Sequence, residues 1–511
     1  MELPLLTRAD QPGSFVTLSA PDSASAGDTT FCGANVGRAP LRTPDAGEQY
    51  RFHFDMTKCI GCKCCVVACN EQNGNPSDIF WRRVGEVEGG VYPHTQRHYL
   101  SIGCNHCLEP TCMTGCPVDA YSKDGLTGIV RHSADACIGC QYCTWNCSYG
   151  VPQFNAERGV VGKCDMCYGR LENGQHPACV VACPEDAIQI EIVRVEDWQR
   201  EYREHANSPG MPSADDSIST TRITLPRSLP ENLGRVDLGH LQPESPHWPL
   251  VFMTVLTQLS VGVFAAVLSM QAFTARANRF AGLVALVIAF SALSASTLHL
   301  GRPLYAARAL KMWRRSWLSR EVLLFTLFAG AATLYALCLW MGISFAIVAG
   351  ALTVVCGLAG VGASARLYLA PGRPAWNSPL TVFEFFATTS LFGAAGFALL
   401  ANTDNAIWLV STCTLFCVLV PCVKFLRFAR SSSHQLYGTW QLLSTTLSNR
   451  LILRFALLIA GLWAFGVGSA IPARVVALLL FLAAEFLGRY LFFVSVVPTN
   501  IASGFLMPEA G

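Results

Sequence analysis

Sixteen of the 23 cysteines in this chain lie in four groups between Cys59 and Cys183, and their spacing indicates redox chemistry. Three thiolates at short spacing can hold one face of a 4Fe-4S cluster, and the fourth cysteine of such a group typically ligates a neighbouring cluster. Sixteen ligands therefore predict four 4Fe-4S clusters, which transfer electrons one at a time. The groups are Cys59, Cys62, Cys65 and Cys69; Cys104, Cys107, Cys112 and Cys116; Cys137, Cys140, Cys143 and Cys147; and Cys164, Cys167, Cys179 and Cys183.

Two other uses of cysteine fit this pattern less well. Structural zinc also binds pairs of cysteines two residues apart, but it has no use for a regular third and fourth cysteine. A disulfide framework suits a short secreted chain, whereas this chain has 511 residues. Small and β-branched residues between the cysteines, such as Ile60 and Gly61, also suit a backbone that closes around a cluster.

The cysteine groups are internally repeated. The first group matches the third in register, and the second matches the fourth, with Cys-Pro at the end of both. This duplication is typical of a doubled two-cluster ferredoxin, in which clusters come in pairs. Pairing the first group with the fourth and the second with the third is the interpretation we favour, although the sequence alone does not prove it. Cys64 falls outside the shared register, and we expect it to be packing, like Cys32.

A hydrophobic second half follows from about His247. Hydrophobic residues make up 51% of the chain and charged residues 14%, and the hydrophobic excess lies after this point. Eight apolar stretches are each long enough to cross a bilayer as a helix, which takes about 20 residues. They cover residues 249–272, 279–298, 321–341, 344–369, 379–401, 406–426, 451–469 and 475–497.

The fold class is therefore an α+β ferredoxin-like domain fused to an all-α bundle of eight transmembrane helices. We expect a flexible segment at 1–49, the cluster domain at 50–199, a Pro- and Ser-rich linker at 200–246, the membrane anchor at 247–500 and a tail at 501–511. Proline at many positions of the linker disfavours a helix there.

The cysteine-rich half resembles the four-cluster iron–sulfur subunit of the dimethyl sulfoxide reductase family, through CNHCLEPTCMTGCP and CIGCQYCTWNCSYGVPQFN. The membrane half is similar to that family's anchor subunit in HWPLVFMTVLTQLSVGVF, TLHLGRP, SWLSRE and AEFLGRYLFF. In the family these are usually separate proteins, and here they are fused. The resemblance implies a further chain that carries a molybdenum bis-pterin cofactor and performs the substrate chemistry, so that no molybdenum cofactor belongs to this chain.

The resemblance also implies a quinol site at the membrane boundary nearest the clusters, formed by His299 and Glu321. Arg302 and Arg320 lie nearby in the sequence, where they could orient Glu321 or hold its charge. Quinol oxidation releases two protons with two electrons, and histidine or a partly buried glutamate can accept protons near neutral pH. The structural alternatives are an interfacial cap for His299 and an ordinary acid at a helix N-terminus for Glu321.

Glu485 and Arg489 lie four residues apart in the last apolar stretch. Ionisable residues in lipid are costly unless they are paired, so we expect an intramembrane ion pair, with a proton path as the alternative. Haem is not expected, because a bundle haem usually needs two histidines at membrane depth and His434 falls in a polar loop. Quinone is thus expected to exchange electrons directly with the nearest cluster.

Lysine and arginine placement predicts the orientation. An even number of helices puts both ends of the chain on one side, and twelve cations lie in loops of that side against three on the other. By the positive-inside rule, the clusters and both termini face the cytoplasm from the inner membrane. The alternative is that some of these arginines bind the cluster domain, so that their placement does not follow from the orientation in the membrane. The twelve are Arg302, Arg308, Lys311, Arg314, Arg315, Arg320, Arg366, Arg373, Lys424, Arg427, Arg430 and Arg450; the three are Arg276, Arg279 and Arg474.

We therefore expect a non-catalytic electron-transfer and anchor subunit of a quinone-linked molybdenum oxidoreductase, embedded in the bilayer and in contact with the quinone pool. A self-contained cluster enzyme is disfavoured, because every group has four cysteines and leaves no open coordination position. The alternative is an ion-translocating or redox-regulated membrane module of a larger respiratory complex. A net charge of +2 gives no indication of nucleic-acid binding.

Overall fold

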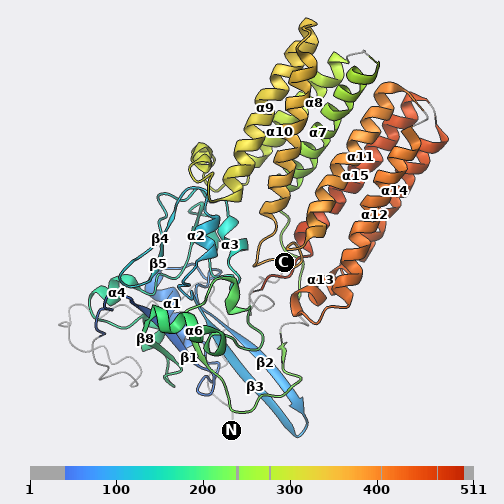
Figure 1. Ribbon diagram of the computed structural model, residues 1–511. Helices are drawn as coiled ribbons and strands as arrows, with labels where there is room; N and C mark the ends of the chain where they lie inside the picture. The colour runs from blue at the N-terminus through green and yellow to red at the C-terminus, as the bar shows by residue number, and fades with distance from the viewer. Residues whose placement is uncertain (1–40, 237–240, 275–277, 404–405, 469, 500–511) are drawn as a thin grey trace, which may run out of the picture. The chain divides into compact units, whose positions relative to one another are not determined.

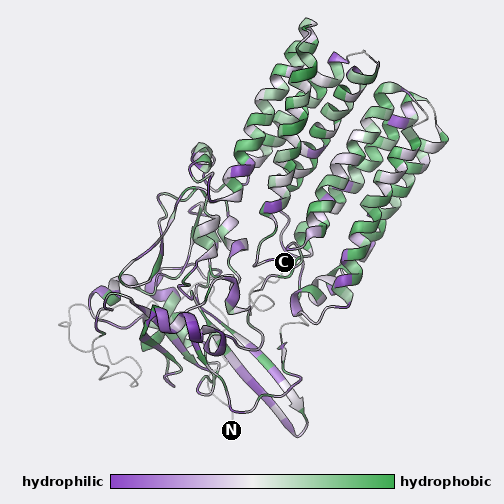
Figure 2. Ribbon diagram, viewed as in Figure 1, coloured by the Kyte–Doolittle hydropathy of each residue, from purple (hydrophilic) through white to green (hydrophobic). Residues whose placement is uncertain are grey.

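The computed structural model describes residues 41–236, 241–274, 278–403, 406–468 and 470–499. We call residues 41–236 the head and residues 241–499 the membrane half. Strands and short helices build the head, whereas the described part of the membrane half is helical (Figure 1). Hydrophobic residues dominate the long helices and alternate with polar ones in the head (Figure 2).

The first head sheet is centred on β1 (Glu48–Asp55). This strand lies between β8 (Ile188–Arg194), to which it is antiparallel, and β9 (Arg222–Thr224), to which it is parallel. Tyr50, Phe52 and Phe54 are buried at the two-residue spacing that places strand side chains on one face. They pack in the same core as cysteines of the first and fourth groups.

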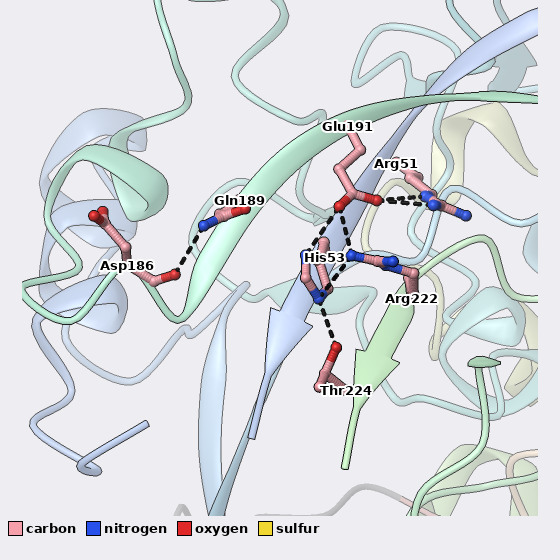
Figure 3. A network of polar contacts seen from close by, with 7 residues as sticks. All are labelled: Arg51, His53, Asp186, Gln189, Glu191, Arg222 and Thr224. Atoms are coloured by element: carbon pink, nitrogen blue, oxygen red, sulfur yellow. Dashed lines mark hydrogen bonds and ion pairs between the residues drawn. The ribbon is translucent and has the colours of Figure 1, made fainter. Parts of the chain in front are cut away.

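Glu191 on β8 holds the three strands of this sheet together (Figure 3). Its carboxylate accepts hydrogen bonds from Arg51 on β1 at 2.9 Å and from Arg222 on β9 at 2.8 Å. His53 Nδ1 lies 3.0 Å from the same carboxylate. Burial alone would raise the pKa of Glu191, but His53, Arg51 and Arg222 outweigh it and lower the pKa to about 2. The network therefore stabilises the sheet above the ordinary glutamate pKa and is lost as the pH falls toward 2.

The second sheet has the order β10-β2-β3. Its long hairpin joins β2 (Arg83–Val91) to β3 (His94–Ile102), and β10 (Gly234–Arg235) pairs with β2. Two smaller hairpins separate the cysteine groups. They are β4 (Tyr121–Lys123) with β5 (Val130–His132), and β6 (Gln153–Asn155) with β7 (Val160–Gly162).

Short helices begin at or beside the cysteine groups and supply the backbone that surrounds them. These helices are α1 (Cys64–Asn73), α2 (Thr111–Gly115), α3 (Tyr142–Asn146), α4 (Tyr168–Glu172) and α5 (Ala178–Val181). The ferredoxin-like α+β class predicted for the head is confirmed.

The segment expected to be a linker at 200–246 is largely part of the head. Helix α6 (Val195–His205) runs across the expected boundary at residue 199, and its Trp198 is fully buried. A short 3-10 helix, η1 (Ala214–Asp216), precedes β9, and both β9 and β10 complete head sheets. The sequence suggested a connector because β9 and β10 have only three and two residues, too few to give a strand pattern among the surrounding prolines and serines.

Eight helices in the described part of the membrane half are long and apolar enough to cross a bilayer, as predicted. Helix α7 is the most enclosed of them and packs against α8, α10, α11 and α15. Two shorter elements that the sequence did not indicate join them: η3 (Pro303–Leu310) and α13 (His434–Ser444). The eight are α7 (Trp248–Thr274), α8 (Arg279–Thr297), α9 (Trp317–Met341), α10 (Ala346–Leu367), α11 (Pro379–Ala401), α12 (Ile407–Ala429), α14 (Ser448–Val467) and α15 (Ile471–Val494).

Three glycines allow the head to contact the α8–α9 connection at the level of the backbone. Gly301 donates its N–H to the carbonyl of Gly139 at 3.3 Å, and the next residue, Arg302, donates to Ile138 at 3.1 Å. A Cβ on Gly139 would lie 2.8 Å from the Cα of Gly301, and a Cβ on Gly301 would overlap the carbonyl oxygen of Gly159. Gly139 lies beside Cys140, so this contact places the third cysteine group against the membrane half.

Further hydrogen bonds extend the same contact. Ser316 Oγ donates to the carbonyl of Gly115 at 2.6 Å, and Met312 N–H donates to that of Pro117 at 3.2 Å. Arg315 forms an ion pair with Asp119 at 3.0 Å. The beginning of α9 is therefore tied to the second cysteine group.

We predict that Gly301→Ala destabilises the protein by about 1–3 kcal/mol, because the added methyl group must displace backbone atoms. Thermal unfolding in detergent, with proteolysis of the head as a second measurement, checks this prediction. Gly330→Ala on α9 is the matched control, because a Cβ there meets no heavy atom within 4 Å in the described part of the chain. Equal melting temperatures for the two variants would contradict it.

Candidate cluster and quinone sites

The same backbone loop occurs in all four cysteine groups. The first Cys-x2-Cys pair of each group has a positive φ at its second intervening residue, which turns the chain between the two cysteines. The four residues are Gly61 (72°), His106 (44°), Gly139 (69°) and Met166 (61°). Glycine adopts this conformation freely, whereas it costs energy for His106 and Met166, so the surrounding structure must impose it. The repeat in sequence is thus a repeat in backbone geometry.

Two cavities in the head are lined by four cysteines each. The first is lined by Cys59, Cys62 and Cys65 together with Cys183, the last cysteine of the fourth group. The second is lined by Cys104, Cys107 and Cys112 together with Cys147, the last cysteine of the third group. In each cavity, three thiols therefore come from one group and the fourth from another.

The remaining eight cysteines divide in the same way. Cys116 lies close enough to Cys137, Cys140 and Cys143 to interact with them electrostatically. Cys69 does so with the first three cysteines of the fourth group, Cys164, Cys167 and Cys179. We number the four sets after the cysteine group that supplies three of the four members. The fourth member comes from another group: it is Cys183 in set 1, Cys147 in set 2, Cys116 in set 3 and Cys69 in set 4.

Hydrogen-bond donors surround these sulfurs. Backbone N–H groups of Ala120, Gly139, Met166 and Ala187 each donate to a cysteine Sγ at 3.3–3.4 Å. Such donors stabilise the negative charge that cluster sulfur carries. The donor set and the four-cysteine cavities fit multi-iron clusters.

A third cavity, of about 250 Å³, lies where the head meets α7, α8 and α9. Cys140 of set 3 lines it together with His299 and Glu321. Tyr142, Trp145 and Tyr368 supply aromatic surface, and the rest of the lining is largely apolar. A largely apolar cavity with a few polar groups is the usual form of a site for a small hydrophobic ligand.

His299 is held in a defined tautomer. Its Nδ1 contacts the carbonyl of Ser296, which can only accept, so Nδ1 carries the proton. Burial lowers the pKa of His299 to about 4, and the ring is therefore neutral at pH 7. Neutral imidazole with Nδ1 protonated leaves Nε2 as a hydrogen-bond acceptor.

Glu321 is 6% exposed near the start of α9, and its polar neighbour is Ser364 on α10. Arg320 does not hold this carboxylate: its guanidinium donates to the carbonyls of Trp313 and Arg314. Arg302 also points elsewhere, donating from Nη1 to the carbonyl of Ala134 at 2.8 Å. The structure thus brings His299 and Glu321 to one cavity and gives Arg302 a contact with the head.

The ion pair of Glu485 differs from the expected one. Glu485 pairs with Arg454 on α14 at 3.5 Å and accepts a hydrogen bond from Thr388 at 2.6 Å. Arg489 instead donates to Gln258 at 3.2 Å and lies over the ring of Phe385 at 3.8 Å. Residues four apart share a helix face, but a neighbouring helix here offers Glu485 a cation, because Gly488 leaves room for the Arg454 guanidinium.

A second membrane cavity, of about 370 Å³, lies among α11, α12, α14 and α15. It is lined by Glu384, Lys424 and Arg454, and Lys424 pairs with Glu384 at 2.6 Å. Trp376 lies between the two membrane cavities. It lines this one, and its ring centroid is 5.3 Å from that of Trp145, which lines the cavity of His299 and Glu321.

Comparison with known protein families matches the head and the membrane half separately. A model described as "4Fe-4S dicluster domain" matches residues 95–192, and one described as "DMSO reductase anchor subunit" matches residues 243–494. A component chain of the anaerobic dimethyl sulfoxide reductase of Haemophilus influenzae is 36% identical over 177 residues, which are 33% of this chain and 85% of that one. The chain belongs to the dimethyl sulfoxide reductase family. In this member, an iron–sulfur head and a multi-pass membrane anchor form one polypeptide.

Two further relatives match the head. The probable anaerobic dimethyl sulfoxide reductase chain YnfG of Escherichia coli is 41% identical over 150 residues, which are 28% of this chain and 73% of that one. One of the subunits of the sulfite dehydrogenase of Allochromatium vinosum is 36% identical over 160 residues, or 27% and 67% of the two chains. The iron–sulfur head is thus shared by relatives whose names refer to different substrates.

Several residues of these sites were missed by sequence reasoning. Tyr142 and Trp145 lie inside the third cysteine group, so their aromatic character next to ligand positions was a usable signal. Ser217 Oγ lies 3.1 Å from Cys107 Sγ, yet it is a serine in a polar segment and gave no signal. Cys64, expected to be packing, is exposed at the start of α1. Cys32 lies outside the described residues.

We predict that Cys116→Ser removes the same cluster signal as Cys137→Ser, and that Cys112→Ser removes a different one. The reason is that Cys116 lies with the third group, whereas Cys112 lies with Cys147. Low-temperature electron paramagnetic resonance with iron analysis checks this prediction. Cys64→Ser, outside the four sets, should leave the iron content unchanged. Loss of one shared signal from Cys112→Ser and Cys116→Ser would contradict the crossed arrangement.

Proposed function

We propose that this chain carries four 4Fe-4S clusters and exchanges electrons between a membrane quinone and a separate molybdenum bis-pterin catalytic subunit. The observation that carries this proposal is the cavity lined at once by Cys140, His299 and Glu321. It brings a cluster ligand and two candidate proton-exchanging groups to one hydrophobic space that a quinone can enter from the bilayer.

The four cysteine sets support a count of four clusters. When bound, each cluster would accept or donate one electron. The protein's own part is to bury the thiolates, to direct backbone N–H groups at them and to keep neighbouring sets close. Crossed fourth cysteines bring set 1 next to set 4 and set 2 next to set 3, which favours electron transfer within each pair.

His299 and Glu321 would manage the protons of the quinone reaction. Oxidation of a quinol to a quinone releases two electrons and two protons, and reduction takes up the same numbers. Nε2 of neutral His299 would accept a hydrogen bond from one quinol hydroxyl, and the Glu321 carboxylate would accept from the other. Glu321 is buried and His299 is half-buried, which limits the access of water to these hydrogen bonds.

A catalytic partner would bind beside set 1, at the other end of the series of sets. Ile60, which lines the cavity of set 1, is 58% exposed, and Val67 on α1 and Val181 on α5 are exposed at 62% and 37%. Apolar residues gathered beside a redox centre are suited to a protein partner that excludes water from the junction. The relatives named above are chains of multi-subunit oxidoreductases, which supports such a partner.

The head and both chain ends would lie on the cytoplasmic side of the inner membrane. Of the twelve cations counted on that side, Arg302, Arg308 and Arg315 contact the head and so have a structural role. Lys424 is buried in its ion pair with Glu384, and the eight others still outnumber the three on the opposite side.

Ion translocation is a second candidate function, favoured by one observation. Glu384, Lys424, Arg454 and Glu485 form buried ion pairs beside the second membrane cavity. Buried charges within membrane helices are costly and often functional. Proton movement into vesicles during quinol oxidation would favour this role, whereas its absence would leave the charges structural.

We predict that Glu321→Gln slows quinol-dependent cluster reduction by about 10²-fold or more, because one proton acceptor is lost. Stopped-flow absorbance of the clusters with a quinol analogue measures the rate. Iron content should be unchanged, since Glu321 is not a cluster ligand. Glu384→Gln in the other cavity is the matched control, and an unchanged rate in Glu321→Gln would remove this residue from the site.

A reporter fused after Gly511 should behave as cytoplasmic, because eight spans return the chain to the side on which α7 begins. A pair of fusions, to alkaline phosphatase and to green fluorescent protein, measures this, and fluorescence without phosphatase activity is expected. A fusion after Met341, at the end of α9, should give the opposite result. Phosphatase activity after Gly511 would overturn the proposed orientation.

A further inference from the structure

The two pairs of cysteine sets meet at a junction that no cysteine group spans. The first and fourth groups both contribute to sets 1 and 4, and the second and third groups both contribute to sets 2 and 3. Between the pairs, Cys104 of set 2 and Cys164 of set 4 interact electrostatically. Electrons that cross the head must pass this junction between set 2 and set 4.

A buried lysine occupies this junction. Lys163 is 4% exposed, and its Nζ lies 3.6 Å from Cys104 Sγ and donates to the carbonyl of Cys164 at 2.6 Å. It also donates to the carbonyl of Val130. The side chain therefore touches both sets, one through a sulfur and the other through the backbone of a ligand.

Neutral acceptors and thiolates, rather than a carboxylate, surround this cation. In the part of the chain that the structure describes, Lys163 forms no ion pair with Asp or Glu; Asp165 acts on it at longer range. An ammonium group is costly to bury without a negative partner. The negative partners available to it are the cysteine sulfurs of sets 2 and 4, and Cys104, Cys112 and Cys164 all act on it.

We propose that Lys163 raises the reduction potentials of both clusters at this junction, in sets 2 and 4, and so sets the electron step between the two halves of the head. This inference rests on the four-cluster assignment made above. Adding an electron makes a cluster more negative, and a fixed positive charge next to its ligands favours that state. Lys163 thus acts on the clusters through its positive charge and is not a cluster ligand.

Lys123 provides a matched comparison. Its Nζ donates to the carbonyls of Cys107 at 3.0 Å and Leu108 at 3.2 Å, both beside set 2. Cys107 is also the cysteine that acts on it electrostatically, so Lys123 belongs to the surroundings of set 2 alone. Neutralising Lys123 should therefore affect one cluster, whereas neutralising Lys163 should affect two.

The test is a redox titration of the full chain, purified anaerobically and followed by electron paramagnetic resonance. In Lys163→Met, the equilibrium constant for reduction should fall at least tenfold for two clusters, which is about 59 mV each. Lys163→Arg should shift both potentials less than Lys163→Met does, because the positive charge is kept. Lys123→Met should shift the potential of the set 2 cluster alone. Signals of sets 2 and 4 are assigned beforehand from those missing in Cys112→Ser and Cys179→Ser.

The outcomes separate this inference from the proposed function. Fewer than about sixteen irons in the unmodified chain would contradict the four-cluster assignment itself. With all clusters present, unchanged potentials in Lys163→Met, or a shift in one of the two clusters alone, would overturn the role of Lys163. If Lys163→Met loses iron, Lys163→Gln replaces it. Loss of iron from both neutral variants but not from Lys163→Arg would assign the lysine to cluster assembly and overturn the proposal.

Discussion

Close backbone contact between Gly301 and the Gly139–Gly159 pair is the constraint on which the arrangement of both halves depends. Side chains at these positions would force the head away from the α8–α9 connection. Because Gly139 adjoins Cys140 and Gly301 lies two residues after His299, this one contact holds the cysteine and the histidine around the same cavity. Electron transfer weakens steeply with separation, so a contact without side chains is suited to the place where the proposed quinone would approach a cluster.

Burial of the cysteines ties the head's stability to its metal content. Burial raises the pKa of the Cys107 thiol to about 12 and that of the Cys69 thiol to about 12, so the metal-free head favours neutral thiols. Cluster binding requires thiolates, and the N–H and O–H donors around the sulfurs stabilise them. Ser217 reaches Cys107 from 110 residues further along the chain, so at least one of these donors comes from outside the cysteine groups.

The fold class and the eight membrane helices could be predicted from sequence, because cysteine spacing and long apolar runs are strong local signals. Short strands of the connector could not, since β9 is three residues long and is stabilised by its pairing with β1. His299 and Glu321 could be placed together at the boundary facing the clusters through family resemblance, whereas Cys140 emerged as their neighbour only from the folded chain. The partner of Glu485 could not, because local spacing pointed to Arg489, whereas Arg454 of α14 lies closer in the folded bundle.

The strands contributed by the connector also determine where the polypeptide can be divided. Arg222 on β9 binds Glu191, and β10 pairs with β2, so a fragment ending near residue 200 would lose an edge from each of two sheets. Such a truncation would leave Glu191 without one of its cations and expose the backbone of β1 to solvent. A soluble version of the head, made for spectroscopy or crystallisation, should therefore extend through Arg235.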